Sequence, residues 1–535
     1  MEGHSTPNSL STTRVCLPCK KQKRKCDKAL PRCSACRYRN QDCTYSDFVP
    51  DDDISFIKQR LDTLESLLRV GVVPEVTSRR SKAADIQSAG LVLPASSNYD
   101  EHSFKFPPMF VLDTRVWQKA MTPIVTPLLS PPQELLTLLG AENDTMKIIS
   151  SYFNIVHTWL PMVWKRHFAP GFMHRLTNAD LALLVACMKL VTDEPADNHQ
   201  PLKSPLYVLV RQFSEKMESS GLLSLHLIQA TVLISVYEVG HGIYPSAYMS
   251  IGRGIRLAQL MGCHDQTVPS GRYHALSRGE AEEQRRTWYS LLLLDRVVNM
   301  SFLGRSLYFG DFTNNDRLPC ETDLWDRGEV APNEPLFVIS ATSIKATPFG
   351  RLCQVALLLG RVINHRNDRQ DASYAAKFVD AMQLQRTINA LLRIITAEFE
   401  KDPAAFCIPL AMGLSTKMVL CQIYSCNMYI PLSKTVEEAD AQVAALTDLK
   451  AVPEEVASFH RRLTEHVDVF KIGPLICPCL YQAIVIITYF LRETCDHQLE
   501  KSRIPLINCL RIIKGQWAVA GIYLDNIHSD DIIPL

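Results

Sequence analysis

Residues 16–26 read CLPCKKQKRKC, in which two cysteines lie three positions apart and a third follows after six polar residues. Five of these six residues are basic, and only Gln22 is neutral. A buried core does not tolerate this density of charge, because the charges would lose their hydration without gaining partners. The stretch therefore belongs at a surface, and packing does not explain its cysteines.

The first 43 residues contain six cysteines that form one C-x2-C-x6-C unit and its repeat. They are Cys16, Cys19, Cys26, Cys33, Cys36 and Cys43. Disulfides would need an oxidising compartment, and the polar N-terminus MEGHSTPNSLSTTR is not typical of a secretory signal. Chance is a poor account, because two C-x2-C pairs and matching six-residue gaps would have to coincide. Metal binding remains, whereas the other eleven cysteines are scattered among apolar neighbours and are expected to pack as small hydrophobic residues.

Counting ligands predicts how many metal ions this segment binds. Zinc takes four thiolates tetrahedrally at about 2.3 Å. Six cysteines supply two such sites only if two of them bridge both ions while the other four each bind one. The repeat favours the first cysteine of each half, Cys16 and Cys33, as the bridging ligands. The sequence therefore predicts two zinc ions.

Positive charge is concentrated around the same cysteines. Residues 16–43 hold nine of the 57 Lys and Arg residues but two of the 56 Asp and Glu residues, so this segment carries +7 and the remainder −6. Two zinc ions on six thiolates leave a net charge of −2, which needs fewer cations than are present. The excess predicts a polyanionic partner for this segment alone, and a nucleic acid accounts for it best.

The cysteine pattern resembles the DNA-binding domain of the fungal binuclear zinc-cluster transcription factors. The likeness runs from Cys16 to Cys43 and includes the proline of ALPRC, Pro31. It implies a short helix after each C-x2-C pair, the first over residues 20–25, with its end in the major groove of double-stranded DNA above a CGG-type triplet. Guanine offers O6 and N7 acceptors there, which match a lysine or arginine donor.

The positions of the basic residues suggest different roles for them in the DNA contact that the resemblance implies. Lys23 is expected to read bases, with Lys20 and Lys25 nearer phosphates. Gln22 departs from the basic residue that family members often have, and its amide could favour adenine or bond a phosphate. For each residue the alternative is a solvated surface charge. The full set of expected DNA contacts is Lys20, Lys21, Gln22, Lys23, Arg24, Lys25, Arg37 and Arg39, the two arginines binding phosphate.

The segments around the cluster suggest a tether and a dimer seam. Residues 1–15 are expected to be disordered, 44–53 to form a linker, and 71–140 to be flexible or irregular. Between them, apolar residues follow steps of three and four, which is an a/d pattern of a little over two heptads. This pattern predicts a short coiled coil over 54–70 and a homodimer; the alternative is an amphipathic helix that packs on its own body. The seam residues are Ile54, Ile57, Leu61, Leu64 and Leu68.

From 141 to 535 the apolar periodicity is helical throughout, which predicts a large all-α domain. Segments 151–168, 247–264 and 282–307 resemble the middle regulatory region of the same family. The most apolar run, CLYQAIVIITYFL at 479–491, is shorter than the roughly 20 residues of a bilayer span, so it is expected to be a buried helix and no membrane partner is expected. The fold class is thus a zinc-cluster domain plus short coiled coil, then an all-α regulatory domain.

The helical region shows no pattern typical of an enzyme. Gly252 and Gly254 form G-x-G, but Leu257 stands where a dinucleotide fingerprint needs glycine, and neither H-E-x-x-H nor G-x-S-x-G occurs. Trp159, Trp164 and Trp288 are expected in the core, and Arg285, Arg286 and Asp295 are expected to link helices.

These patterns predict a nuclear, sequence-specific transcription factor for RNA polymerase II genes that works with the transcription machinery. Its target genes are expected in a secondary-metabolite biosynthetic cluster, a base-rate expectation among the roles of the family. The alternative is a corepressor or sequestering protein without specific site recognition, which Gln22 alone supports. An enzyme with a DNA anchor lacks any nucleophile, base or cofactor pattern.

Overall fold

The computed structural model describes residues 15–43, 129–193, 200–264, 277–308, 316–330, 333, 346–368, 374–425, 435–468, 472–494 and 497–528. The chain divides into two compact units, Met1–Pro107 and Pro108–Leu535. The expected disordered N-terminus, the linker 44–53, the dimer seam over 54–70 and most of the stretch 71–140 lie outside the described residues.

The first unit contains two short helices, α1 (Leu17–Lys21) and α2 (Ser34–Tyr38). Each starts directly after the first cysteine of its half, and Pro18 in the first turn of α1 loses no hydrogen bond because helix N-termini leave those N–H groups unpaired. The predicted bounds of the first helix, residues 20–25, are therefore wrong, because α1 begins at Leu17 and ends at Lys21. The left-handed backbone of Lys23, with φ 49°, prevents its continuation.

The second unit is helical, and the described residues contain no β-strand. Its first half comprises α5 (Gln133–Leu139), α6 (Glu142–Ile155), η1 (Lys165–Phe168), η2 (Phe172–Thr177), α7 (Ala179–Thr192), η3 (Pro201–Lys203), α8 (Pro205–Ser219), α9 (Leu225–Gly240), α10 (Ser246–Met261), α11 (Arg278–Asn299) and α12 (Thr322–Arg327). Its second half comprises α13 (Pro348–Asn367), α14 (Tyr374–Phe399), α15 (Pro403–Ser425), α16 (Val436–His466), η5 (Pro474–Ile476), α17 (Cys477–Thr494), α18 (His497–Ile513) and α19 (Val519–His528).

Helix α5 lies inside the stretch 71–140 that was expected to be flexible or irregular. Its Leu135 and Leu139 are buried against the body, so the helical domain begins before residue 141. The prolines around this segment hide its short apolar periodicity in the sequence. Pro131 and Pro132 nevertheless lie directly before the helix and therefore do not interrupt it.

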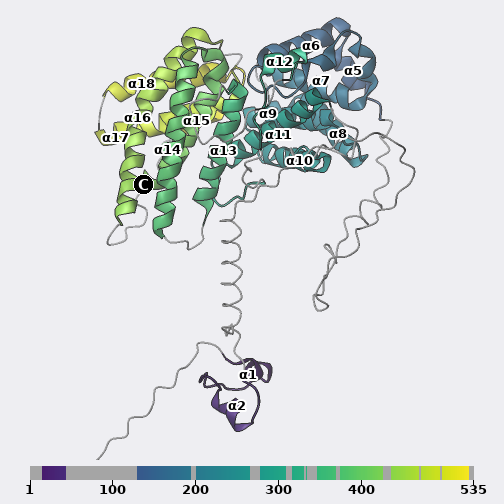
Figure 1. Cartoon of the computed structure of the whole chain (residues 1–535). Helices are drawn as coiled ribbons and strands as arrows, with labels where there is room; N and C mark the ends of the chain where they lie inside the picture. The colour runs from purple at the N-terminus through teal and green to yellow at the C-terminus, as the bar shows by residue number, and fades with distance from the viewer. Residues whose placement is uncertain are drawn as a thin grey trace, which may run out of the picture. The chain divides into compact units, whose positions relative to one another are not determined.

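Two helices organise the halves. In the first half α9 packs against α7, α10 and α11, and in the second α15 packs against α13, α14 and α16 (Figure 1). Both α9 and α15 are apolar on nearly all sides, which is typical of helices at the centre of a bundle. Contacts of α11 with α13 and of α9 with η5 join the halves into one hydrophobic core.

Two segments, Pro403–Ser425 and Pro474–Thr494, are long and apolar enough to cross a membrane by length and composition alone. Of their most apolar windows, 83% and 56% are buried inside the body, so both behave as core helices. The run 479–491, expected to be a buried helix, lies within α17, where Leu480, Ile484 and Ile487 are fully buried.

Candidate metal centre and nucleic-acid interface

The six N-terminal cysteines converge on one point. Cys16 and Cys33 are fully buried at the N-termini of α1 and α2, and their Sγ atoms are 3.6 Å apart. The Sγ of Cys19 lies 3.8 Å from that of Cys33, and the Sγ of Cys26 lies 3.7 Å from that of Cys16. A tetrahedral zinc with bonds of about 2.3 Å places its sulfurs about 3.8 Å apart, so this spacing fits thiolate ligands of zinc.

The sulfurs form two groups of four that share two members. One group contains Cys16, Cys19, Cys26 and Cys33, the other contains Cys16, Cys33, Cys36 and Cys43, and within each group the Sγ atoms lie within 4.8 Å of one another. Cys16 and Cys33 belong to both groups, at the positions where ligand counting places the bridges. Each group can hold one zinc ion.

Burial makes the two shared thiols poor anions in the absence of a metal ion. It raises the pKa of the Cys33 thiol to about 12 and raises the pKa of Cys16 still further. Six thiolates this close would also repel one another. Zinc removes both costs, because a coordinating thiol is deprotonated outright and its charge is neutralised by the ion. The donor set therefore fits two zinc ions, and binding and folding of this domain are thermodynamically coupled.

The two halves of the domain have the same backbone pattern. The N–H of Arg24 donates to the Cys19 carbonyl over 3.0 Å, and the N–H of Gln41 donates in the same way to Cys36 over 3.1 Å. Lys23 and Asn40, seventeen residues apart, both have left-handed backbones, with φ of 49° and 50°. Asparagine tolerates this conformation, whereas at lysine it costs about 1 kcal/mol. The strain falls on the residue that sequence reasoning assigns to base reading.

All eight expected DNA contacts have exposed side chains. Lys20 and Lys21 end α1, Gln22 is its C-cap, and Lys23, Arg24 and Lys25 follow; Arg37 lies in the last turn of α2, and Arg39 is its C-cap. Within residues 15–43, Arg32 pairs with Asp42 at 3.1 Å, but none of the eight forms an ion pair with a described residue. Their charges remain available to a polyanion.

Two further residues of this domain were not singled out from the sequence. Tyr38 is 94% exposed between Arg37 and Arg39, so an aromatic ring stands in the second basic stretch. Asp27 accepts from the backbone N–H of Ser34 over 3.0 Å and thereby fixes the start of α2. The aromatic residue in a basic run was a visible signal for Tyr38, whereas nothing in the spacing indicated that Asp27 would contact Ser34.

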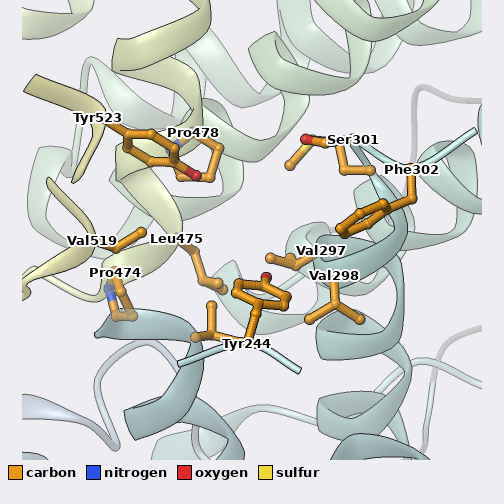
Figure 2. Close-up of a pocket in the computed structure, with 12 residues that line it drawn as sticks. Tyr244, Val297, Val298, Ser301, Phe302, Pro474, Leu475, Pro478, Val519 and Tyr523 are labelled. Carbon is orange, nitrogen blue, oxygen red and sulfur yellow. The ribbon is translucent and has the colours of Figure 1, made fainter. Parts of the chain in front are cut away.

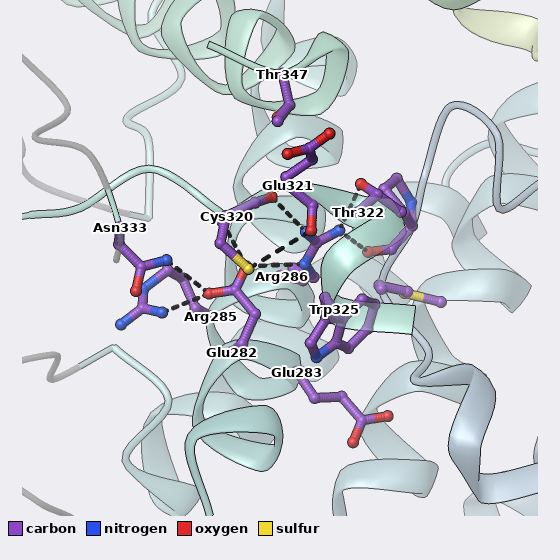
Figure 3. A network of polar contacts seen from close by, with 12 residues as sticks. Glu282, Glu283, Arg285, Arg286, Cys320, Glu321, Thr322, Trp325, Asn333 and Thr347 are labelled. Atoms are coloured by element: carbon purple, nitrogen blue, oxygen red, sulfur yellow. Dashed lines mark hydrogen bonds and ion pairs between the residues drawn. The ribbon is translucent and has the colours of Figure 1, made fainter. Parts of the chain in front are cut away.

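In the helical body, Arg286 links elements as expected. Its guanidinium is fully buried and donates to Glu282 Oε1 over 2.9 Å, to the carbonyl of Pro161 over 3.1 Å and to that of Cys320 over 2.6 Å (Figure 3). It also lies 4.3 Å from the centre of a Trp325 ring. The bonds to Pro161, Thr322 and Cys320 join α11 to the segment after α6, to α12 and to the residues before α12, so this group is structural.

Other motifs of the body are also packing features. Gly252 and Gly254 lie inside α10, away from any phosphate-binding turn, and a Cβ at Gly254 would lie 2.7 Å from Leu291 Cδ2. Trp159 and Trp288 are buried, as expected of core residues, whereas Trp164 is only partly buried, with its indole N–H donating to the Trp325 carbonyl over 2.7 Å. A cavity of about 210 Å³ lies between α11 and the segments of α17 and α19, with mainly apolar walls (Figure 2). None of these arrangements contains a nucleophile aligned with a base.

Comparison with known proteins supports the same family for both units. The model described as the fungal Zn(2)-Cys(6) binuclear cluster domain matches residues 14–51, and the model described as the fungal specific transcription factor domain matches residues 149–392. Transcription factor BOA15 of Botryotinia fuckeliana (strain B05.10) is 34% identical over 185 residues, which cover 33% of this chain and 98% of that protein.

Two longer matches are with regulators of biosynthetic genes. The depudecin biosynthesis cluster-specific transcription activator DEP6 of Fusarium langsethiae is 26% identical over 356 residues, 55% of this chain and 57% of that protein. The citrinin biosynthesis transcriptional activator ctnR of Monascus purpureus is 22% identical over 497 residues, 87% of this chain and 84% of that protein. With its cluster of six thiols for two zinc ions and its helical regulatory region, the chain belongs to the fungal zinc-cluster transcription factors and is not an enzyme.

Proposed function

We propose that this DNA-binding transcription factor acts in the nucleus on RNA polymerase II genes and reads CGG-type triplets through Lys23. The observation that carries the proposal is the exposed, left-handed Lys23 directly after α1, on a support held by buried cysteines. A lysine fixed at this point can donate to guanine O6 and N7. The flanking Lys20 and Lys25 suit phosphates, which set the register without reading sequence.

The ligand roles follow from the shared sulfurs. Cys16 and Cys33 bridge the two ions, and the remaining four cysteines each bind one. Because both bridges are helix N-caps, the ions set the positions of α1 and α2 together. Metal binding thereby fixes the position of Lys23 after α1, where we propose that it reads bases. It also fixes Arg39 at the end of α2, where we propose that it binds phosphate.

A homodimer is the second part of the proposal, and it rests on the apolar seam of residues 54–70 in the sequence. A dimer reads two triplets, and the segment 44–53 contributes to their spacing. Sedimentation of the purified protein tests this part. The wild type should sediment as a dimer and the Leu61→Asp variant as a monomer, because a charge at a seam position is not tolerated; a dimer in both would contradict the seam.

The target genes are proposed from the relatives. DEP6 and ctnR are named as activators of depudecin and citrinin biosynthesis. We therefore expect this chain to regulate a biosynthetic gene cluster, as an activator that engages the transcription machinery. Selection of bound sites from random duplexes, compared with promoters of the source genome, identifies the cluster. Sites confined to promoters of unrelated genes would contradict this assignment.

The same selection tests Lys23 with the zinc-loaded, full-length protein. The Lys23→Ala variant should keep two zinc ions but lose about 1–3 kcal/mol of discrimination at one base pair. Lys20→Ala is the matched control, because losing a phosphate contact weakens all sequences alike and lowers the salt slope by about 0.9. Unchanged base preference in Lys23→Ala would exclude Lys23 as the reading residue. No preference in the wild type would favour a sequestering protein instead.

A further inference from the structure

A cleft of about 1,100 Å³ lies between the two halves of the helical body. One wall consists of the end of α6, the segment leading to η1, and α12. The other consists of the starts of α13 and α15 and the end of α16. Both walls contain aromatic and aliphatic side chains, among them Phe153, Phe349, Phe406 and Ile408. The volume lies slightly above the roughly 300–1,000 Å³ typical of small-molecule sites.

Two buried or partly buried side chains of this cleft, His157 and Asp326, lie against each other, and each has a polar atom without a described hydrogen-bond partner. The side chain of His157 is 7% exposed, and its Nδ1 has no hydrogen bond to any described residue. Its Nε2 lies 3.3 Å from Asp326 Oδ2 without hydrogen-bonding alignment, and Asp326 Oδ1 also has no described partner. Buried polar atoms without partners are rare in folded proteins, so each one calls for an explanation such as strain or a bound ion.

The charge of the cleft indicates which ligand would fit. Burial lowers the pKa of His157, so the imidazole is neutral near pH 7 and gives Asp326 no cation. Four more carboxylates line the cleft, against the single lysine Lys165. They are Glu321, Asp323, Asp402 and Asp468. A cation would compensate the partly buried Asp326, and the aromatic walls would bind its apolar body and favour a positive charge over their faces.

We propose that this cleft binds a small molecule with a protonated amine on an aromatic or aliphatic body. The ammonium group donates to Asp326, and the unpaired nitrogen of the neutral His157 ring accepts a further hydrogen bond. The apolar part lies against Phe153 and Phe406. The protein thus has a ligand site in its regulatory body, separate from its metal centre.

The cleft wall shares residues with the buried hydrogen-bond network of Arg286. Pro161, Cys320 and Thr322 line the cleft, and all three accept hydrogen bonds from Arg286 (Figure 3). A ligand that contacts both walls binds the joined halves more tightly than the separated ones. It therefore stabilises the body in proportion to its concentration, following RT ln(1 + [L]/Kd).

The test uses the zinc-loaded, full-length protein and three probes that share the indole ring. Tryptamine is protonated at pH 7, 3-ethylindole is neutral, and indole-3-acetate is an anion. Titration calorimetry and thermal unfolding should show that tryptamine binds at least about tenfold more tightly than either of the others, the preference given by one charge-assisted hydrogen bond. Equal binding of the three, or no binding of tryptamine at about 10 mM, would overturn the proposal.

Variants locate the site. Asp326→Asn should weaken tryptamine binding at least about tenfold. The double variant Glu321→Gln, Asp323→Asn changes two exposed residues, should keep the fold, and should weaken binding severalfold, so it decides the matter if Asp326→Asn does not fold. Glu329→Gln is the matched control on an exposed carboxylate outside the cleft. Binding unchanged in both cleft variants would refute the site. None of these measurements involves DNA, so failure here is distinct from failure of the triplet-reading proposal.

Discussion

Replacing Arg286 by methionine removes one charge from the centre of the helical body and keeps much of its volume. The structure predicts a large loss of stability. Glu282 would remain buried with Arg285 as its remaining described cation, and the carbonyls of Pro161 and Cys320 would lose their donor. Removing one partner of a buried ion pair costs about 3–5 kcal/mol, which is also the cost expected here.

Urea unfolding of the full-length protein, followed by tryptophan fluorescence, measures this loss. With a slope of about 3 kcal/mol/M, the midpoint should fall by about 1–1.7 M. The matched control is Arg327→Met on α12, whose 61% exposed side chain pairs weakly with Glu329 and should contribute less than about 0.5 kcal/mol. Adding Glu282→Gln to the Arg286 variant should cost less than the sum of both changes, because the unpaired charge is then gone. A loss below about 1 kcal/mol for Arg286→Met would refute the assigned role of the network.

Three further outcomes follow from the metal centre and from one buried pair. Cys16→Ala should abolish binding of both zinc ions, as measured by elemental analysis, whereas Cys187→Ala in the body should retain them; two ions in Cys16→Ala would contradict bridging. Chelation of zinc should abolish DNA binding yet leave most far-UV helical signal, since among the described residues the candidate metal ligands gather only in the cysteine cluster; loss of both together would contradict this independence. Burial lowers the pKa of His167, but the contact with Glu283 outweighs this effect and raises the pKa above its ordinary value of 6.5. The ion pair therefore stabilises the body fully below pH 6.5, and this stabilisation is lost as pH rises through the pKa of the folded state. His167→Gln should flatten the decline of unfolding free energy above about pH 6.5; an equal decline in both proteins would exclude this pair as its cause.

The metal centre could be predicted from the sequence because its six ligands lie close together along the chain. Ligand spacing, ligand number and the tetrahedral preference of zinc together require six cysteines and two ions, and the structure gathers the same sulfurs. The helix limits could not be predicted as well. Helix α1 begins directly after Cys16, with Pro18 in its first turn, and ends before the left-handed turn at Lys23, whereas the resemblance alone placed that helix three residues too late.

The organisation of the body depends on long-range pairing that periodicity does not contain. Arg286 contacts Pro161 and Cys320, which are 125 and 34 residues away, and its sequence neighbours give no indication of either. The cleft is hidden for the same reason, since Phe153 and Phe406 meet only when the two halves assemble. Apolar spacing predicts that a helix has a buried face, but it does not predict which helix covers that face.

The zinc-cluster unit and the helical body are stabilised in different ways. In the small unit the cysteines are the main buried side chains, so its positions for Lys23 and Arg39 depend on metal ions. The described part of the body has a large continuous core, which can accommodate a buried group such as His157, whose Nδ1 has no described hydrogen-bond partner. A stable core tolerates the cost of such groups where a small domain would not. A ligand site is therefore expected in the body, and the metal-dependent unit is expected to be confined to DNA.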